Sequence, residues 1–388
     1  MSRLITRTVW ILSLVSLFTD MASEMLYPVM PLFLRDIGFS IALIGLLEGV
    51  AEATAGLSKG YFGQLSDVTG RRLPFVRLGY ALSALSKPLM AISTHAWWIF
   101  TVRTTDRLGK GLRTAARDAL LSAEATPGTK ARVFGLHRAM DTTGAFIGPA
   151  LALLFLFLYP GEYKWLFVMA LFPGLAAITL TLLVKEKSLP ARTQPVSFVS
   201  FINWWKSSPS GYRQVAGGLL VFALINSSDV FLLLRARESG IGDTAIIGLY
   251  IGYNAVYAAL SYPVGVLADR WGIQRTLVIG LVLFAVAYTG FGWRNNMLWL
   301  GLFFAIYGLY AACTESIAKA WITNLVTKDQ TATAIGTFTA FQSIASLFAS
   351  ILAGLIWYAG GATVLFATTG IGSALLALYF SRLKVHHQ

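Results

Sequence analysis

The sequence has almost no cysteine and few charged residues. Only one cysteine occurs among 388 residues, so an internal disulfide is impossible, and the apolar run around Cys313 indicates a buried thiol. Aspartate, glutamate, lysine and arginine make up only 13% of the chain, too few for a large soluble protein. No G-x-x-x-x-G-K-[ST] segment occurs, which argues against nucleotide-driven work. We expect no cofactor and no resident metal.

Apolar residues take up most of the remaining sequence. They account for 56% of the chain, the mean hydropathy is +0.65, and long apolar runs recur along the whole length. A bilayer core of about 30 Å is crossed by about 20 helical residues. Backbone groups in lipid must be paired within the segment, so the spans should be helices rather than open strands. The sequence therefore predicts an all-α integral membrane protein.

Twelve such segments can be placed, six on each side of a polar, proline-containing connection. We expect an N-terminal six-helix bundle at 1–184, a cytoplasmic linker at 185–213 and a C-terminal six-helix bundle at 214–388. Pro28 and Pro31 should kink the first span, and an interfacial helix is expected near Phe198–Trp205. The predicted spans lie near 8–34, 41–66, 73–93, 97–121, 132–157, 163–184, 214–236, 244–268, 275–293, 297–323, 332–358 and 361–383.

The positive charge is distributed in alternate loops. The net charge is +13, and basic residues gather at Arg71 and Arg72, in the linker and in the C-terminal tail. This pattern is typical of the cytoplasmic side of a membrane protein and argues against a nucleic-acid partner. Both termini should therefore be cytoplasmic, in a multi-pass monomer of the inner membrane. The apolar stretch after Arg7 continues to Leu34, which favours an uncleaved first span over a signal peptide.

A short sequence occurs twice, each time at the end of a long apolar segment. The repetition indicates a duplicated unit, as in secondary transporters whose substrate binds between two repeats in the bilayer. The acid and its basic neighbours in the first copy are predicted to form a cytoplasmic latch that breaks when the halves move. In the second copy Gln274 replaces one of the paired bases. The copies are Gly63-Gln-Leu-Ser-Asp67-Val-Thr-Gly70-Arg71-Arg72 and Gly265-Val-Leu-Ala-Asp269-Arg270-Trp-Gly272-Ile-Gln274-Arg275.

These motifs make the chain similar to the twelve-span transporters of the major facilitator superfamily, over essentially its full length. The loop from Gly63 to Arg72 resembles the family signature between spans two and three, and Arg107 with Gly111 resembles the R-x-x-x-G pattern of span four. The resemblance implies two pseudo-symmetric six-helix bundles and alternating access driven by an ion gradient.

A third motif resembles one branch of that family. Gly144, Gly148 and Pro149 match the G-x-x-x-G-P of the proton-coupled drug and solute antiporters, although Leu151 and Ala152 stand where that pattern has a glycine pair. The match implies a proton-coupled antiporter in which these three residues take part in gating.

Charged residues within the predicted spans point to the functional site, because each costs about 2.5 kcal/mol or more at the centre of a bilayer. Most lie in the first half, and those of span four share one helical face. The candidates for proton coupling are Asp20, Glu24, Glu48, Glu52, His137 and Asp141. The candidates for substrate binding are Arg103, Asp106, Arg107, Lys110, Arg113, Asn226, Asp229, Asn254, Glu315, Lys319 and Gln342.

The proton-coupling candidates have different expected roles. Asp20 and Glu24 are four residues apart and are preferred as the proton carriers, because burial and a neighbouring acid both favour the protonated form. Glu48 and Glu52 are expected to pair with basic residues of span four or with Lys59. In the second half, Glu315 and Lys319 are also four residues apart, so they could pair with each other instead of binding substrate.

The leading prediction is a proton-coupled antiporter that exports a small organic compound. One alternative is a carrier of an anionic metabolite bound by the basic residues of span four. Another is a divalent-metal transporter that uses Asp20, Glu24, His137 and Asp141 as ligands. An intramembrane enzyme is not expected, because no catalytic motif accompanies the buried charges. A channel is disfavoured, because a duplicated latch suits alternating closure better than a continuous pore.

Overall fold

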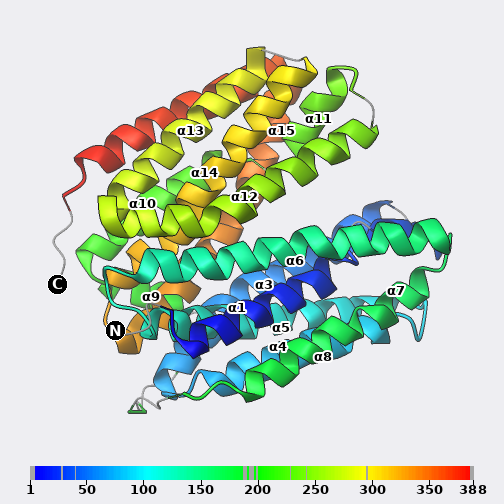
Figure 1. Cartoon of the computed structure of the whole chain (residues 1–388), viewed down its shortest axis with the longest axis horizontal. Helices are drawn as coiled ribbons and strands as arrows, with labels where there is room; N and C mark the ends of the chain where they lie inside the picture. Colours follow the sequence, from blue (N-terminus) through cyan, green and yellow to red (C-terminus); the bar gives the residue numbers. More distant parts are fainter. Residues whose placement is uncertain are drawn as a thin grey trace. The chain divides into compact units, whose positions relative to one another are not determined.

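The computed structural model describes residues 5–27, 29–39, 41–186, 190–191, 196–197, 200–227, 229–241, 243–293 and 296–384. Pro28 and Phe198, named above, lie outside these residues. Within the described part of the chain, every regular element is a helix (Figure 1). The helices coincide with the predicted spans.

The helices of the first half show where single spans are divided. The first span is split, because one helix ends at Glu24 and the next begins at Met30, which confirms the expected interruption. The sixth span is divided at Ala170. The helices are α1 (Arg7–Glu24), α2 (Met30–Asp36), α3 (Ile41–Val68), α4 (Leu73–Leu89), α5 (Ala96–Ala123), α6 (Lys130–Leu158), α7 (Tyr163–Met169) and α8 (Leu171–Leu182).

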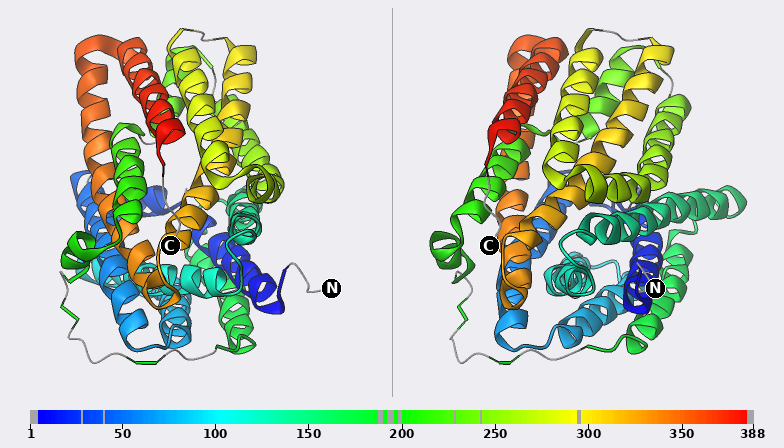
Figure 2. Two further views of the ribbon diagram at one scale, coloured as in Figure 1. Left: turned by 90° about the vertical axis from the view of Figure 1, so that its left-hand side faces the viewer. Right: turned by 60° about the vertical axis from the view of Figure 1, so that its left-hand side comes forward.

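The second half repeats the division of its first span, between Ile225 and Val230. Its last helical stretch covers two predicted spans. Gly361 divides that stretch with a φ of 77°, a left-handed conformation that favours glycine, and the chain then runs back along itself (Figure 2). The elements are α9 (Ser200–Ser207), α10 (Ser210–Ile225), α11 (Val230–Glu238), α12 (Asp243–Trp271), α13 (Ile273–Trp293), α14 (Met297–Asn324), η1 (Lys328–Gln330) and α15 (Thr331–Arg382).

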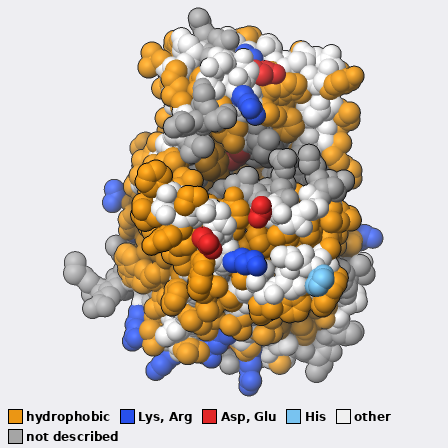
Figure 3. Space-filling model, turned by 90° about the vertical axis from the view of Figure 1, so that its right-hand side faces the viewer, with side chains coloured by type: hydrophobic (Ala, Val, Ile, Leu, Met, Phe, Trp, Pro, Cys, Tyr) orange, Lys and Arg blue, Asp and Glu red, His pale blue; other side chains and the backbone are white. Residues whose placement is uncertain are grey.

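The surface of these helices is apolar. Many large hydrophobic side chains are exposed, among them Phe157, Leu298 and Tyr358, and hydrophobic side chains cover most of the described surface in Figure 3. Among the described residues, five helical stretches are long and apolar enough to cross a membrane by themselves. These stretches are Lys130–Leu158, Tyr163–Leu182, Ile273–Trp293, Met297–Asn324 and Lys328–Arg382.

The contacts divide the chain into two compact units. The first unit comprises Met1–Glu124, Met140–Ser207 and Thr327–Ala340. The second comprises Ala125–Ala139, Ser208–Val326 and Phe341–Gln388. Each unit thus includes a short segment from the other half of the sequence: the start of α15 packs in the first unit, and the start of α6 packs in the second. The bundle boundaries at residues 184 and 214 stay a prediction.

Candidate functional site

The first copy of the repeated loop ties α3 to the start of α15. One oxygen of the buried Asp67 carboxylate accepts a hydrogen bond from the Arg72 guanidinium at 2.8 Å. The other accepts from the main-chain N–H and the hydroxyl of Thr333, at 2.7 and 3.0 Å. A carboxylate at a helix N-terminus is favoured by the unpaired N–H groups and the helix dipole. Arg72 therefore supplies the paired base, whereas Arg71 is exposed, and Gly70 provides the turn with a φ of 66°.

The second copy makes the equivalent contact in the second unit. Asp269 accepts hydrogen bonds from the main-chain N–H groups of Ala131 and Arg132, at 3.1 and 3.2 Å, where α6 begins. The Arg132 side chain adds an ion pair at 2.6 Å. Each repeated acid thus holds the first turn of a helix from the opposite half of the sequence.

Glycine permits both contacts. A Cβ placed on Gly63 would lie 2.5 Å from the carbonyl oxygen of Ala332, and one placed on Gly265 would lie 2.5 Å from that of Ala131. Real Cβ atoms do not approach carbonyl oxygens so closely, so only glycine allows the backbones to meet there. The duplicated glycines are therefore needed for helix packing.

The two copies differ in their polar partners. Arg270 is exposed. Gln274 donates hydrogen bonds to the carbonyl oxygens of Phe380 and Leu383, at 2.7 and 2.8 Å, and so ties α13 to the end of α15. The asymmetry predicted from Gln274 therefore has a structural role that the sequence pattern did not indicate.

The antiporter-like glycines bring α6 against α1 within the first unit. A Cβ on Gly144 would lie 2.2 Å from the Leu17 carbonyl oxygen, and one on Gly148 would lie 2.5 Å from that of Met21. Pro149 follows inside α6. Small residues at such positions let membrane helices approach closely. This contact fixes which polar side chains of the two helices can meet.

Two acids meet across this contact. The carboxyl groups of Asp20 on α1 and Asp141 on α6 lie beside each other. Ser16 donates a hydrogen bond to Asp141, and the Arg117 guanidinium donates to the Ser16 hydroxyl at 3.3 Å. Two carboxylates placed side by side repel each other, and a proton on one of them removes the repulsion and allows a hydrogen bond between the two.

The sequence pattern did not predict this pairing. It placed Asp20 beside Glu24 and Asp141 beside His137. In the structure Asp20 lies beside Asp141, Glu24 lies within electrostatic range of Lys110, and His137 belongs to the second unit. Among the residues that the structure describes, no three His, Cys, Asp or Glu side chains lie together as metal ligands would. The four ligands of the metal-transporter alternative therefore do not form a cluster.

Acids of α3 match bases of α5. Arg103 makes a two-pronged contact with Glu48, at 3.0 and 2.8 Å. Arg107 pairs with Glu52 at 3.3 Å, although Glu52 is largely exposed. The forked guanidinium suits such carboxylate contacts. Two of the basic residues proposed to bind an anion are thus already paired with acids.

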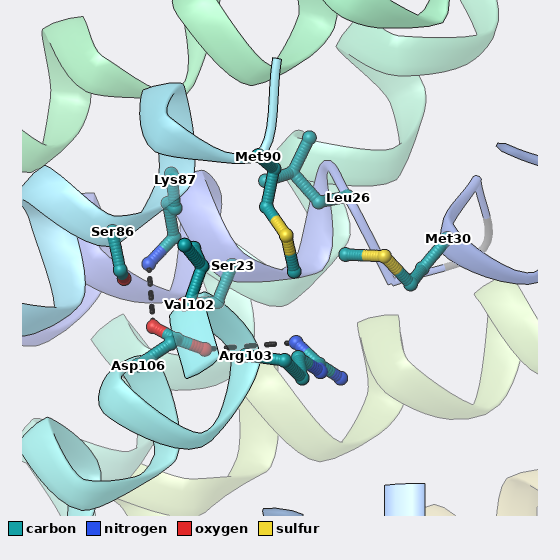
Figure 4. Close-up of a pocket in the computed structure, with 9 residues that line it drawn as sticks. All are labelled: Ser23, Leu26, Met30, Ser86, Lys87, Met90, Val102, Arg103 and Asp106. Atoms are coloured by element: carbon teal, nitrogen blue, oxygen red, sulfur yellow. Dashed lines mark hydrogen bonds and ion pairs between the residues drawn. The ribbon is translucent and has the colours of Figure 1, made fainter. Parts of the chain in front are cut away.

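A small cavity beside these pairs contains a second buried network (Figure 4). Asp106 accepts hydrogen bonds from Lys87 on α4 at 3.2 Å and from Ser83 at 2.5 Å, and lies 3.6 Å from Arg103. Lys87 was not among the predicted site residues, although a lysine within an apolar span indicates a functional or paired charge. The cavity is lined by Ser23, Leu26, Met30, Ser86, Lys87, Met90, Val102, Arg103 and Asp106.

Lys110 and Arg113, the other bases predicted on α5 to bind substrate, have different surroundings. Lys110 lies within electrostatic range of Asp20 and Glu52. Arg113 is buried, with its guanidinium 4.7 Å from the centre of the Tyr80 ring. Two of its nitrogens lack a hydrogen-bond partner among the described residues. A cation over an aromatic face is attracted by the ring quadrupole, which accounts for part of the stabilisation of this buried charge.

The polar residues of the second half surround the break between α10 and α11. Asp229 accepts a hydrogen bond from the Tyr307 hydroxyl at 2.7 Å, and Asn226 donates to the Tyr310 hydroxyl at 3.2 Å. Asn254 donates to a carbonyl of its own helix, and Gln342 is exposed on α15. Asn226 and Asp229 thus each bond to a tyrosine of α14, and the substrate-binding role of all four stays a prediction.

A second cavity lies between α6 and α14, entirely within the second unit. The Arg138 guanidinium pairs with Glu315 and donates to the Tyr257 hydroxyl. Glu315 therefore has a partner that its spacing from Lys319 did not predict. The residues that line this cavity are Phe134, His137, Arg138, Glu315, Ser316 and Lys319.

Comparison with known proteins agrees with this architecture. The sequence profile of the Major Facilitator Superfamily matches residues 12–234 and 215–387. An uncharacterised MFS-type transporter of Methanocaldococcus jannaschii is 33% identical over 361 residues, which cover 92% of this chain and 89% of the relative. A PmrA homologue of Lactococcus lactis, named a multidrug resistance efflux pump, is 23% identical over 326 residues, 80% of this chain and 78% of the relative.

Solved structures show the same fold. The crystal structure of the human organic anion transporter MFSD10 (TETRAN) superposes with a TM-score of 0.81 at 17% identity, over 96% of this chain and 99% of that one. The fold of these transporters is two six-helix bundles, so the predicted fold class is confirmed. This chain belongs to the Major Facilitator Superfamily of membrane transporters.

Proposed function

We propose that this protein is a proton-coupled secondary transporter that exports a small organic compound by alternating access. The observation that carries the proposal is the close approach of α1 and α6 at Gly144, which places the Asp20 and Asp141 carboxyl groups beside each other. Two acids that share one proton can release and rebind it without losing their place in the fold, as in other carboxyl pairs. The efflux pump named among the relatives supports the export direction.

The proposed cycle couples this proton to substrate through one conformational equilibrium. The acid pair takes up a proton from outside, and substrate that enters from the cytoplasm favours its release. Each ligand binds one access state more tightly and so shifts the equilibrium between states. Exchange of the proton for the substrate then allows the inward proton gradient to drive export of the substrate.

The two repeated acids act as latches in this cycle. Asp67 and Asp269 hold the first turns of α15 and α6 in the state described here. Opening the protein on the side of the two repeated loops must break these contacts and expose the N-termini of α15 and α6 to water. With the basic loops facing inward, both latches and both termini lie on the cytoplasmic side of the inner membrane, in a monomer.

Proteoliposomes with an imposed pH gradient test the proposal. The substrate is the compound that most raises the melting temperature of the purified protein in a screen of anionic, cationic and lipophilic compounds. Asp20→Asn and Asp141→Asn should each abolish gradient-driven flux but retain substrate exchange, whereas Glu124→Gln, at an exposed position, should behave as wild type. Full gradient-driven flux in both aspartate variants would refute the coupling role.

A further inference from the structure

We propose that the cavity between α6 and α14 binds an anionic group of the substrate, such as a carboxylate. The inference rests on the proposed transport function and adds the chemical class of the cargo. It concerns a different place from the basic face of α5, which the sequence had suggested for an anion.

The charges of the residues that line the cavity suit an anion. Arg138 and Lys319 are basic, and Glu315 is the one acid among the six lining residues. Arg138 presents a planar fork of N–H donors, the geometry that carboxylates and phosphates accept best. Its Cζ lies 5.1 Å from the centre of the Tyr257 ring, so packing against the ring holds the fork in one orientation. The site is therefore preorganised for a planar anion.

The cavity also contains a donor that the protein leaves unused. Ser316 is 3% exposed, and its hydroxyl has no hydrogen-bond partner among the described residues. Leaving a buried polar group unpaired costs about 1–3 kcal/mol, so such groups in a native protein call for an explanation. A ligand oxygen in the cavity would accept this hydrogen bond. The hydroxyl and the Arg138 fork belong to the same small space.

The ion pair in the cavity is open to exchange. The side chain of Arg138 is 30% exposed and that of Glu315 is 47% exposed. An exposed carboxylate returns readily to water, so a substrate anion can replace Glu315 on Arg138 without leaving a charge buried and unpaired. On α5, Arg103 and Arg107 also lie beside the carboxylate of Asp106, whose side chain is only 13% exposed. An anion on that face would compete with a largely buried acid, which favours the cavity between α6 and α14.

The site is also placed to affect the proton. Arg138 and Asp141 are three residues apart on α6, so they lie on neighbouring parts of one helical face. Movement of this turn of α6, when an anion replaces Glu315, would be passed directly to the Asp141 carboxyl group. Substrate recognition and proton binding would then share one helix, so that each ligand could shift the same conformational equilibrium.

Binding measurements on the full chain in lipid nanodiscs test the assignment. The probes are benzoate, citrate and inorganic phosphate, with benzylamine and benzyl alcohol as ring-matched controls of other charge. At least one anion should raise the melting temperature of the wild type, while the two controls should not. Calorimetry on that anion then gives the affinities of the variants.

Four variants define the expected pattern. Arg138→Gln should weaken anion binding at least about tenfold, and Ser316→Ala should weaken it by a few-fold. Glu315→Gln should tighten it, because the competing carboxylate is removed. Arg275→Gln, an exposed arginine on α13, should bind as wild type. The opposite signs at Glu315 and Ser316 distinguish binding in the cavity from general damage, even if Arg138→Gln folds poorly.

The inference is overturned if none of the three anions stabilises the wild type, if benzylamine stabilises it instead, or if Glu315→Gln weakens anion binding. These outcomes leave the proton-coupling proposal intact, because gradient-driven flux of a cationic or neutral compound would still require Asp20 and Asp141. If the wild type binds the anion but its transport does not depend on the pH gradient, that result would count against the coupling proposal alone.

Discussion

Asp67 and Thr333 are separated by 266 positions in the sequence, yet one oxygen of the Asp67 carboxylate receives both the main-chain N–H and the hydroxyl of Thr333. The carboxylate thus caps the first turn of a helix from the other half of the chain. Asp269 does the same for α6. The duplicated loop has kept one physical task, which is to supply negative charge to a helix N-terminus that would otherwise leave N–H groups unpaired.

Neutralising the first latch should loosen the packing of α15 on α5. Asp67→Asn leaves the Arg72 guanidinium buried without its counter-charge, and breaking a buried pair in this way typically costs about 3–5 kcal/mol. Ala119 is fully buried beside Ala332 of α15, so Ala119→Cys in a Cys313→Ser background reports the opening. Alkylation by N-ethylmaleimide should be faster in Asp67→Asn.

The two neighbouring arginines of the loop provide the control for this prediction. Arg72→Gln should also accelerate alkylation at position 119, whereas Arg71→Gln should not, because Arg71 is exposed. Equal effects of the two substitutions would show that the loop acts through its overall charge rather than through the Asp67–Arg72 pair.

The acid pair predicts a pH-dependent stability. In the proposed pair Asp20 and Asp141 share one proton, so the stabilisation from their hydrogen bond should be present at low pH and be lost as the pH rises and the proton leaves. In Asp141→Asn an amide N–H replaces the shared proton. The melting temperature of the wild type should therefore fall on the alkaline side more than that of the variant. Parallel pH profiles for the two proteins would mean that no proton is shared.

The contact of α6 with α1 should not tolerate a side chain. In Gly144→Val the added Cβ would lie 2.2 Å from the Leu17 carbonyl oxygen, so the helices must separate and Asp141 must move away from Asp20. We expect a large loss of thermal stability and of gradient-driven flux. Gly217→Ala is the matched control: nothing lies within 4 Å of its Cβ position in α10, and alanine is favoured over glycine in a helix by about 1 kcal/mol.

The network behind the first cavity should show strong non-additivity. Lys87→Met alone removes the cation closest to Asp106, at 3.2 Å, and Asp106→Asn alone leaves Lys87 buried without its acid. The double variant should therefore lose less stability than the sum of the two single losses, by roughly 1–3 kcal/mol. Denaturation of the four proteins in detergent measures the coupling, and additive losses would contradict it.

Hydropathy alone was enough to predict the class of fold and the approximate limits of the helices. Apolar runs of membrane length are a local property, and the bilayer leaves helices as the structure that pairs their backbone groups. The break between α1 and α2 was predicted from prolines, and the helix-capping loops from their repetition. These features depend on neighbours in the sequence, and so they can be identified without knowing how the helices pack.

The partners of the buried charges were decided only by tertiary structure. The spacing of Asp20 and Glu24 on one helical face suggested that they interact, but it did not indicate that the close approach of α6 at Gly144 also brings Asp141 to Asp20. In the same way Glu315 pairs with Arg138, a partner that its spacing from Lys319 did not indicate. The sequence determines which face of each helix is polar. Which polar faces meet depends on the rotation and separation of helices distant in sequence, and backbone contacts at small residues set both.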